Sequence, residues 1–68
     1  MSAFNDLYAA IAKAKAISYM TYGDAGEAFR NMSDDAQDEY LWALSDLIAE
    51  ASKALKRLED EDREGRAA

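Results

Sequence analysis

Apolar side chains recur along the first third of the chain at steps of three and four residues. The stripe runs through Phe4, Leu7, Ile11, Ala14, Ser18 and Tyr22. An α-helix turns once in about 3.6 residues, so these steps place the side chains on one face. The spacing predicts a helix over residues 3–22. Ser2 or Asn5 is expected to cap its start, because a short polar side chain can accept from a free backbone N–H there.

A second stripe with the same spacing begins after residue 40. Its members are Leu41, Leu44, Ile48, Ala51, Leu55 and Leu58, with Tyr40 and Leu47 on one side. Alternating steps of three and four are typical of helices that pack side by side. Ser33 is expected to cap this helix, with Asp34 and Asp35 in its first turn, where acids suit the helix dipole. The pattern predicts a helix over residues 34–62 and a flexible C-terminal tail over residues 63–68.

Two glycines separate the stripes. Gly23 is expected to end the first helix in a left-handed conformation. Asp24 and Glu27 have the spacing of a capping box and predict a short helical turn over residues 25–31. The apolar side chains expected to point inward from this turn are Phe29 and Met32. The fold class is therefore all-α, a single domain over residues 1–62 with two long antiparallel helices joined by a short helical connector.

The composition indicates that one hairpin is too small to be stable alone. The chain has 68 residues, half of them apolar and many of these alanine, and it contains neither cysteine nor histidine. Disulfides and the common zinc ligands are thus excluded as staples for a small fold, which leaves association. We expect a homodimer resembling a four-helix bundle, the alternative being a monomer capped by its connector. The expected dimer or core residues are Leu7, Ile11, Leu44, Leu47, Ile48 and Leu55. A second seam is expected from Ala10, Ile17 and Thr21 with Ala36, Ala43, Leu47 and Ala54.

The net charge of −6 restricts the partners. Nucleic acids and anionic membranes repel an acidic chain, whereas a protein with a basic surface attracts it. No apolar run approaches the roughly 20 residues of a membrane span, and the N-terminus lacks the basic and apolar blocks of a signal peptide. We expect a cytoplasmic protein that binds no nucleic acid and no membrane.

Trp42, the only tryptophan, departs from the apolar pattern. At 100° per residue it lies about 140° from the centre of the Leu44–Ile48–Leu55 stripe. Its expected neighbours on that face are Asp35, Asp38 and Asp46, with Glu39 at the margin. An aromatic anchor ringed by polar groups is the usual anatomy of a binding hot spot, and a partner's Arg could stack on the indole. The alternatives are that Trp42 packs against the first helix or connector, or belongs to the oligomer interface. For the acids alone, a solvated helix start is sufficient explanation.

Catalytic chemistry is not expected. Without histidine or cysteine there is no ordinary base–nucleophile pair, and the serines have no evident activator. The DDAQDE run lacks the glycine and the glutamate spacing of a calcium loop, and no cofactor is expected. Tyr8, Lys15 and Tyr19 flank the first stripe and are expected at the rim of the bundle, with a small-ligand or peptide groove as the alternative.

The run AISYMTYGDAGEAFRNMSDDAQDEYLWALSDLIAEA resembles small acidic helical-hairpin proteins of Pseudomonas phages and prophages, a group that includes a quorum-sensing anti-activator. The likeness covers roughly residues 4–58 and rests on the overall pattern, the glycine-containing connector and the aromatic, acidic start of the second helix. It implies a dimer, in the host cytoplasm, that inhibits a LuxR-type transcription activator at its DNA-binding domain. Other implied or conceivable targets are the pilus assembly ATPase, CRISPR interference and a toxin; no contact residue is transferred.

Overall fold

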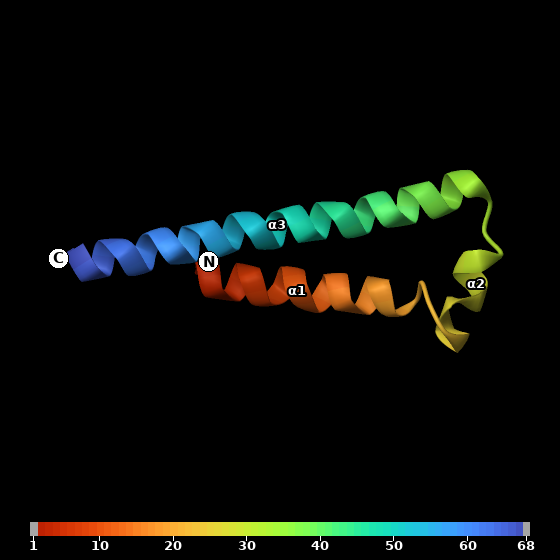
Figure 1. Cartoon of the computed structure of the whole chain (residues 1–68), viewed down its shortest axis with the longest axis horizontal. Coiled ribbons are helices and arrows are strands. Elements are labelled where there is room, and N and C mark those ends of the chain that lie inside the picture. Colours follow the sequence, from red (N-terminus) through yellow and green to blue (C-terminus); the bar gives the residue numbers. More distant parts are fainter. Residues whose placement is uncertain (1, 68) are drawn as a thin grey trace.

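The computed structural model describes residues 2–67, and the regular structure across them is helical throughout (Figure 1). The elements in chain order are α1 (Ala3–Tyr19), the 3-10 turn η1 (Asp24–Gly26), α2 (Glu27–Arg30) and α3 (Asp34–Ala67). Helix α1 packs along α3 in the opposite direction, and η1 and α2 form the connector at one end. The predicted all-α hairpin with a helical connector is therefore confirmed.

Both long helices begin at a serine cap: Ser2 is one of the two residues predicted for α1, and Ser33 is the residue predicted for α3. The Asn5 N–H donates to the Ser2 hydroxyl oxygen at 3.0 Å, and the Ala36 N–H donates to the Ser33 hydroxyl oxygen at 3.2 Å. Each bond satisfies one of the four amide donors that a helix start leaves free. Helix α3 continues to Ala67 rather than ending near residue 62. Residue 68, the last of the predicted tail, lies outside the described residues.

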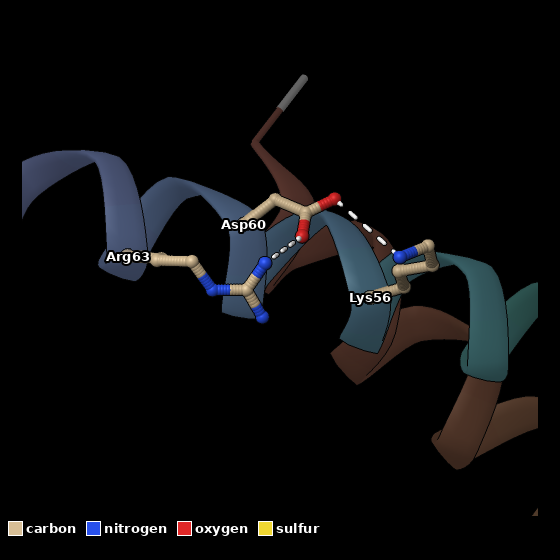
Figure 2. Close-up of polar contacts among 3 residues, drawn as sticks. All are labelled: Lys56, Asp60 and Arg63. Carbon is tan, nitrogen blue, oxygen red and sulfur yellow. Dashed lines mark hydrogen bonds and ion pairs between the residues drawn. The ribbon is translucent and has the colours of Figure 1, made fainter.

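The C-terminal part of α3 extends past the start of α1 and has no helix beside it (Figure 1). Figure 2 shows polar contacts where this segment begins, beside the N-terminal end of α1: Asp60 lies 3.9 Å from the Lys56 ammonium and 3.5 Å from the Arg63 guanidinium. These are the i,i+4 and i,i+3 spacings at which side chains on one helix meet. Such exposed pairs contribute only a few tenths of a kcal/mol each, about 0.3–0.5. They support α3 around the point where its packing against α1 comes to an end, after Leu58.

Helix α1 ends at Tyr19, three residues before the predicted end at Tyr22. The Thr21 backbone N–H and the Thr21 hydroxyl both donate to the Ser18 carbonyl oxygen, at 3.0 and 2.6 Å. A side chain that bonds to the backbone in this way competes with helix continuation. Gly23 has a positive φ of 64°, but its ψ of −157° is not that of the predicted left-handed helical conformation, and it precedes η1 instead of ending α1.

The connector is held by contacts other than the predicted capping box. Neither η1 nor α2 has a side-chain cap hydrogen bond, so the box expected from Asp24 and Glu27 is wrong. Instead the Arg30 guanidinium donates to the Gly23 carbonyl oxygen at 3.0 Å. Phe29 is half-buried, with its ring 5.4 Å from that of Tyr40, as an inward side chain should be.

Met32, the other apolar side chain expected to point inward from the connector, is partly exposed. It lies in the last bend before α3, and its carbonyl oxygen accepts from the Gln37 amide at 2.9 Å. The backbone of this bend is thus tied to the first turns of α3. The Met32 side chain is 36% exposed, so it is largely covered but less shielded than the half-buried Phe29.

The seam between α1 and α3 follows a heptad-like register on both helices. The shielded residues are Ala3, Leu7, Ala10, Ala14 and Ile17 on α1, and Tyr40, Leu44, Leu47, Ala51, Ala54 and Leu58 on α3. Steps of four and three alternate throughout, as in helices packed side by side. Three alanines are the only buried apolar residues within the described chain, and no large side chain is fully buried. A single hairpin therefore has a seam but almost no core.

The rotation of α3 differs from the predicted one. Ile48 and Leu55, expected in the core stripe, are exposed, whereas Leu47 and Ala54 of the predicted second seam lie between the helices. Ala10 and Ala54 are buried there, and their small side chains allow a close approach of the two backbones. Ala43, also predicted in the second seam, is exposed and does not lie between α1 and α3.

Two long-range polar contacts fix this rotation. The Tyr40 hydroxyl donates to the Ile17 carbonyl oxygen at 3.1 Å, and the Arg57 guanidinium pairs with the Asp6 carboxylate. The first contact lies near the connector and the second near the start of α1, so they hold both ends of the seam. The ion pair is partly exposed and is expected to contribute no more than about 1 kcal/mol.

Candidate functional site

Trp42 lies on the face of α3 that is turned away from α1. Its side chain is 66% exposed. At 100° per residue it lies about 160° from the centre of the α3 seam. The structure thus rules out the alternative in which Trp42 packs against α1 or the connector within the hairpin. Its exposure, inferred from the sequence, is confirmed; what contacts it in a complex stays a prediction.

The carboxylates predicted to surround Trp42 are exposed on the same half of α3. They are Asp35, Asp38, Glu39 and Asp46. Residues 34–50 contain six acids and no Lys or Arg. The salt bridges of Lys56, Arg57 and Arg63 involve none of these acids. The charge of this half of α3 is therefore not neutralised by a cation of the described residues, and its field favours a cationic partner. We call Trp42 with these four carboxylates the acidic tryptophan face.

A second surface lies along one flank of the α1–α3 seam. It is an open apolar groove of about 560 Å³. Its lining residues are Leu7, Ile11, Ala14, Lys15, Ser18, Leu44, Ile48, Ala51, Ser52 and Leu55. Phe4 lies seven residues before Ile11, and Leu41 lies seven before Ile48, so both continue the same stripes. Five members of these stripes are exposed, with exposed fractions from 44% at Leu41 to 61% at Phe4; the other three are Ile11, Ile48 and Leu55.

The predicted dimer or core residues are divided between the seam and this groove. Leu7, Leu44 and Leu47 are half-buried between the helices. The other three, Ile11, Ile48 and Leu55, are exposed in the single chain. The register of α3 explains this division, because it turns the Leu47–Ala54 side of the helix toward α1. Whether the groove is covered in an oligomer stays a prediction at this point.

The tyrosines of α1 are not among the residues that line the groove. Tyr8 and Lys15 line a smaller hollow of about 260 Å³ beside Ile11. Tyr19 is exposed, and its ring meets that of Tyr22 edge-on with centroids 6.0 Å apart. Tyr8 thus borders the apolar groove, while Tyr19 points into water. A hollow lined by one tyrosine, one lysine and apolar groups has no arrangement of reactive groups.

The remaining chemistry of the described residues is limited. Between residues 2 and 67 there is no cluster of three or more histidine, cysteine or acidic side chains placed to hold a metal ion. Nor does any helix over that range combine the length and the hydropathy needed to cross a bilayer. The features left to explain are the acidic tryptophan face and the apolar groove.

Comparison with known proteins gives no relative. No family model, no curated protein and no solved structure matches this chain. The class of molecule is thus defined by its own structure: a helical hairpin with an exposed acidic face on one helix and an apolar groove between two. The resemblance to phage hairpin proteins stays a prediction based on the residue pattern.

Proposed function

We propose that this protein is a non-enzymatic inhibitor that acts by binding another protein. In this proposal it is an acidic homodimer that sequesters a basic host regulator, and the favoured target is the DNA-binding domain of a LuxR-type transcription activator. One observation carries the proposal: the only tryptophan is 66% exposed within a helical segment that has six acids and no cation. The choice of target rests on the resemblance stated above.

Trp42 would supply the affinity at the centre of such an interface. Tryptophan is enriched at binding hot spots because it buries a large apolar area with few rotatable bonds. A partner's Arg can also stack on the indole while its guanidinium reaches a neighbouring carboxylate. Asp38 and Asp46 lie four residues on either side of Trp42, so both are one helical turn away from it. This arrangement favours an Arg-rich partner over a merely apolar one.

The surrounding carboxylates would supply selectivity and speed. Opposite charge raises the rate of encounter, and salt weakens this effect because the Debye length is only about 8 Å at physiological ionic strength. A DNA-binding domain has a basic surface where it meets phosphates. A rigid acidic helix docked there occupies the place of DNA. Inhibition would then be steric, and activator bound to this protein would not bind its operator.

The proposal is tested by Trp42→Ala against a matched control, Tyr8→Ala. Tyr8 is an equally exposed aromatic residue, at 70%, but on the other long helix. Binding to a purified LuxR-type DNA-binding domain is measured by calorimetry, with far-UV circular dichroism to verify that each variant is folded. We expect Trp42→Ala to weaken binding by at least about 30-fold, the size of a hot-spot loss of 2 kcal/mol. Tyr8→Ala should bind as the wild type does.

Wild-type affinity in Trp42→Ala would refute the acidic tryptophan face as the site. A different target is separated from a wrong site by using the same pair as bait in host lysate. If a pilus ATPase, a CRISPR component or a toxin is captured by the wild type and Tyr8→Ala but not by Trp42→Ala, the site stands and the activator is the wrong partner. If the activator domain binds none of the three proteins, the proposed target is wrong.

A further inference from the structure

We infer that the apolar groove between α1 and α3 is the surface on which a second copy of this chain docks. The inference rests on the homodimer proposed above and names the face that forms it. The residues that would meet the partner copy first are the exposed ones of the two stripes, Phe4 and Ile11 on α1 with Leu41, Ile48 and Leu55 on α3. Four properties of the hairpin support this: its lack of a core, the few charges in the groove, the polar opposite flank and the apolar area of the groove.

The single chain has almost no core. The only buried apolar residues among those described are Ala3, Ala10 and Ala54, which fill little volume. Small folds without disulfides or metals need another source of burial, and oligomerisation is the usual one. The groove is where the largest exposed aliphatic side chains of the two helices gather, so covering it would create the missing core.

The groove is almost free of charged residues. Lys15 is the only charged residue that lines the groove, although about a third of the chain is charged. Charged residues are depleted at the centre of protein interfaces. An occupant of the groove therefore has to be apolar, which sets it apart from the cationic partner expected at the acidic tryptophan face. A second copy supplies such a surface, because its own groove carries the same stripes.

Only one flank of the α1–α3 seam is apolar. The opposite flank holds the Asp6–Arg57 ion pair. By helix geometry Lys13 and Glu50 lie on that flank too, and both are exposed. A hairpin with one polar and one apolar flank can pair once, groove to groove, in a closed two-fold arrangement. It does not continue into a sheet of hairpins.

The groove also exposes a large apolar area. The five exposed stripe residues keep on the order of 100 Å² of apolar surface each in water, hence about 1,000 Å² in a pair of chains. Residues at the rim, such as Ser52, add to this. A standard stable interface buries about 1,600 Å² in total, with a spread of about 400. The five stripe residues alone thus reach the roughly 1,000 Å² that a specific interface needs at minimum, and the rim adds to that area.

The test is Ile48→Glu in the full chain, with Ala49→Glu as the matched control. Ile48 is 54% exposed in the groove, and Ala49 is the next residue, exposed and turned toward the Trp42 side. Mass is measured by light scattering after gel filtration. We expect wild type and Ala49→Glu at twice the chain mass of 7.5 kDa, and Ile48→Glu at the single-chain mass, with a dimer dissociation constant raised by at least 100-fold.

A second measurement covers the possibility that Ile48→Glu unfolds. The chain has no cysteine, so Ser52→Cys in the groove and Glu50→Cys on the opposite flank each give a unique thiol. We expect the thiol of the Ser52→Cys variant to be labelled more slowly as the protein concentration rises through the dimerisation range. The thiol of the Glu50→Cys variant should be labelled at a constant rate. Both variants keep Ile48.

The outcomes separate the inference from the proposed function. A wild-type chain that stays at its single-chain mass at every concentration overturns both the groove interface and the homodimer. A dimer that survives Ile48→Glu, with equal labelling of the two thiols, overturns the groove as its interface and leaves the homodimer standing. Neither result affects the Trp42→Ala comparison, because Trp42 lies outside the groove.

Discussion

The connector depends on a glycine that a larger residue cannot replace without movement of the backbone. Gly26 is buried, and a Cβ atom there would lie 2.7 Å from the Thr21 carbonyl carbon and 3.0 Å from its oxygen. It would also lie 2.9 Å from an Arg30 guanidinium nitrogen. The arginine can swing away, at the loss of its hydrogen bond to the Gly23 carbonyl oxygen. The Thr21 backbone cannot move alone, since it forms the last turn after α1.

The cost of Gly26→Ala follows from these contacts. Gly26 has φ −83°, which alanine adopts freely, so the penalty is steric and not conformational. Overpacking of this kind costs roughly 1–3 kcal/mol. The lost arginine hydrogen bond adds about 0.5–1 kcal/mol, and the reduced entropy of the unfolded chain returns about the same amount. We expect a net loss of about 2 kcal/mol, or roughly 8–16 °C in the melting temperature of so small a domain.

Urea unfolding followed by far-UV circular dichroism measures this loss. All variants are compared at one protein concentration, because association would make stability concentration-dependent. Gly65→Ala is the matched control: nothing lies within 4 Å of its added Cβ, and in the helix it should be neutral or stabilising by up to about 1 kcal/mol. A Gly26→Ala protein as stable as Gly65→Ala would refute the close approach of the connector to Thr21.

Two further predictions concern aromatic residues of α3. Tyr40→Phe keeps the ring contact with Phe29 but loses the hydroxyl bond to the Ile17 carbonyl oxygen, so the free energy of unfolding should fall by about 1 kcal/mol with no change in helix content; an unchanged urea midpoint would argue against that bond. Relative to a free indole, Trp42 fluorescence should be quenched more by caesium and less by iodide, because nearby carboxylates attract cations and repel anions. Both differences should shrink in high salt, and quenching equal to that of free indole in low salt would contradict the acidic surroundings.

Features of the fold with a local physical cause were predictable from the sequence. Ser2 and Ser33 mark helix starts because a hydroxyl next to a helical stretch satisfies a free amide. Exposure of Trp42 followed from its angle to every apolar stripe on α3, whichever stripe forms the seam. The local capping rule failed at Asp24 and Glu27, where the tight turn brings Arg30 to the Gly23 carbonyl instead.

The rotation of α3 about its own axis was not predictable in the same way. Leu47 and Ile48 are neighbours that both lie at the edge of one broad apolar face, about 100° apart. Either could face α1 as far as periodicity is concerned. Contacts between distant residues decide it: the Tyr40–Ile17 hydrogen bond joins residues 23 apart, and the Asp6–Arg57 ion pair joins residues 51 apart. The residues next to these partners in the sequence give no signal that the two contacts form.

This rotation determines how the two proposed interactions relate. With Leu47 turned toward α1, the Ile48 stripe borders the groove, and Trp42 lies about 120° further around the helix from Ile48. A second copy seated on the groove would therefore leave Trp42 uncovered, and the dimer would carry two equivalent acidic tryptophan faces. For a target with two basic sites, the second contact becomes intramolecular and raises the overall affinity without any new interaction.

If the Ile48→Glu variant is monomeric as expected, it tests more than the interface. It retains Trp42, Asp38 and Asp46 unchanged, so its affinity for an isolated target domain should equal that of the wild type measured per chain. Any additional affinity of the wild type for a two-site target then measures bivalency alone. A loss of affinity for the single domain as well would mean that the groove and the acidic tryptophan face act together in one binding surface.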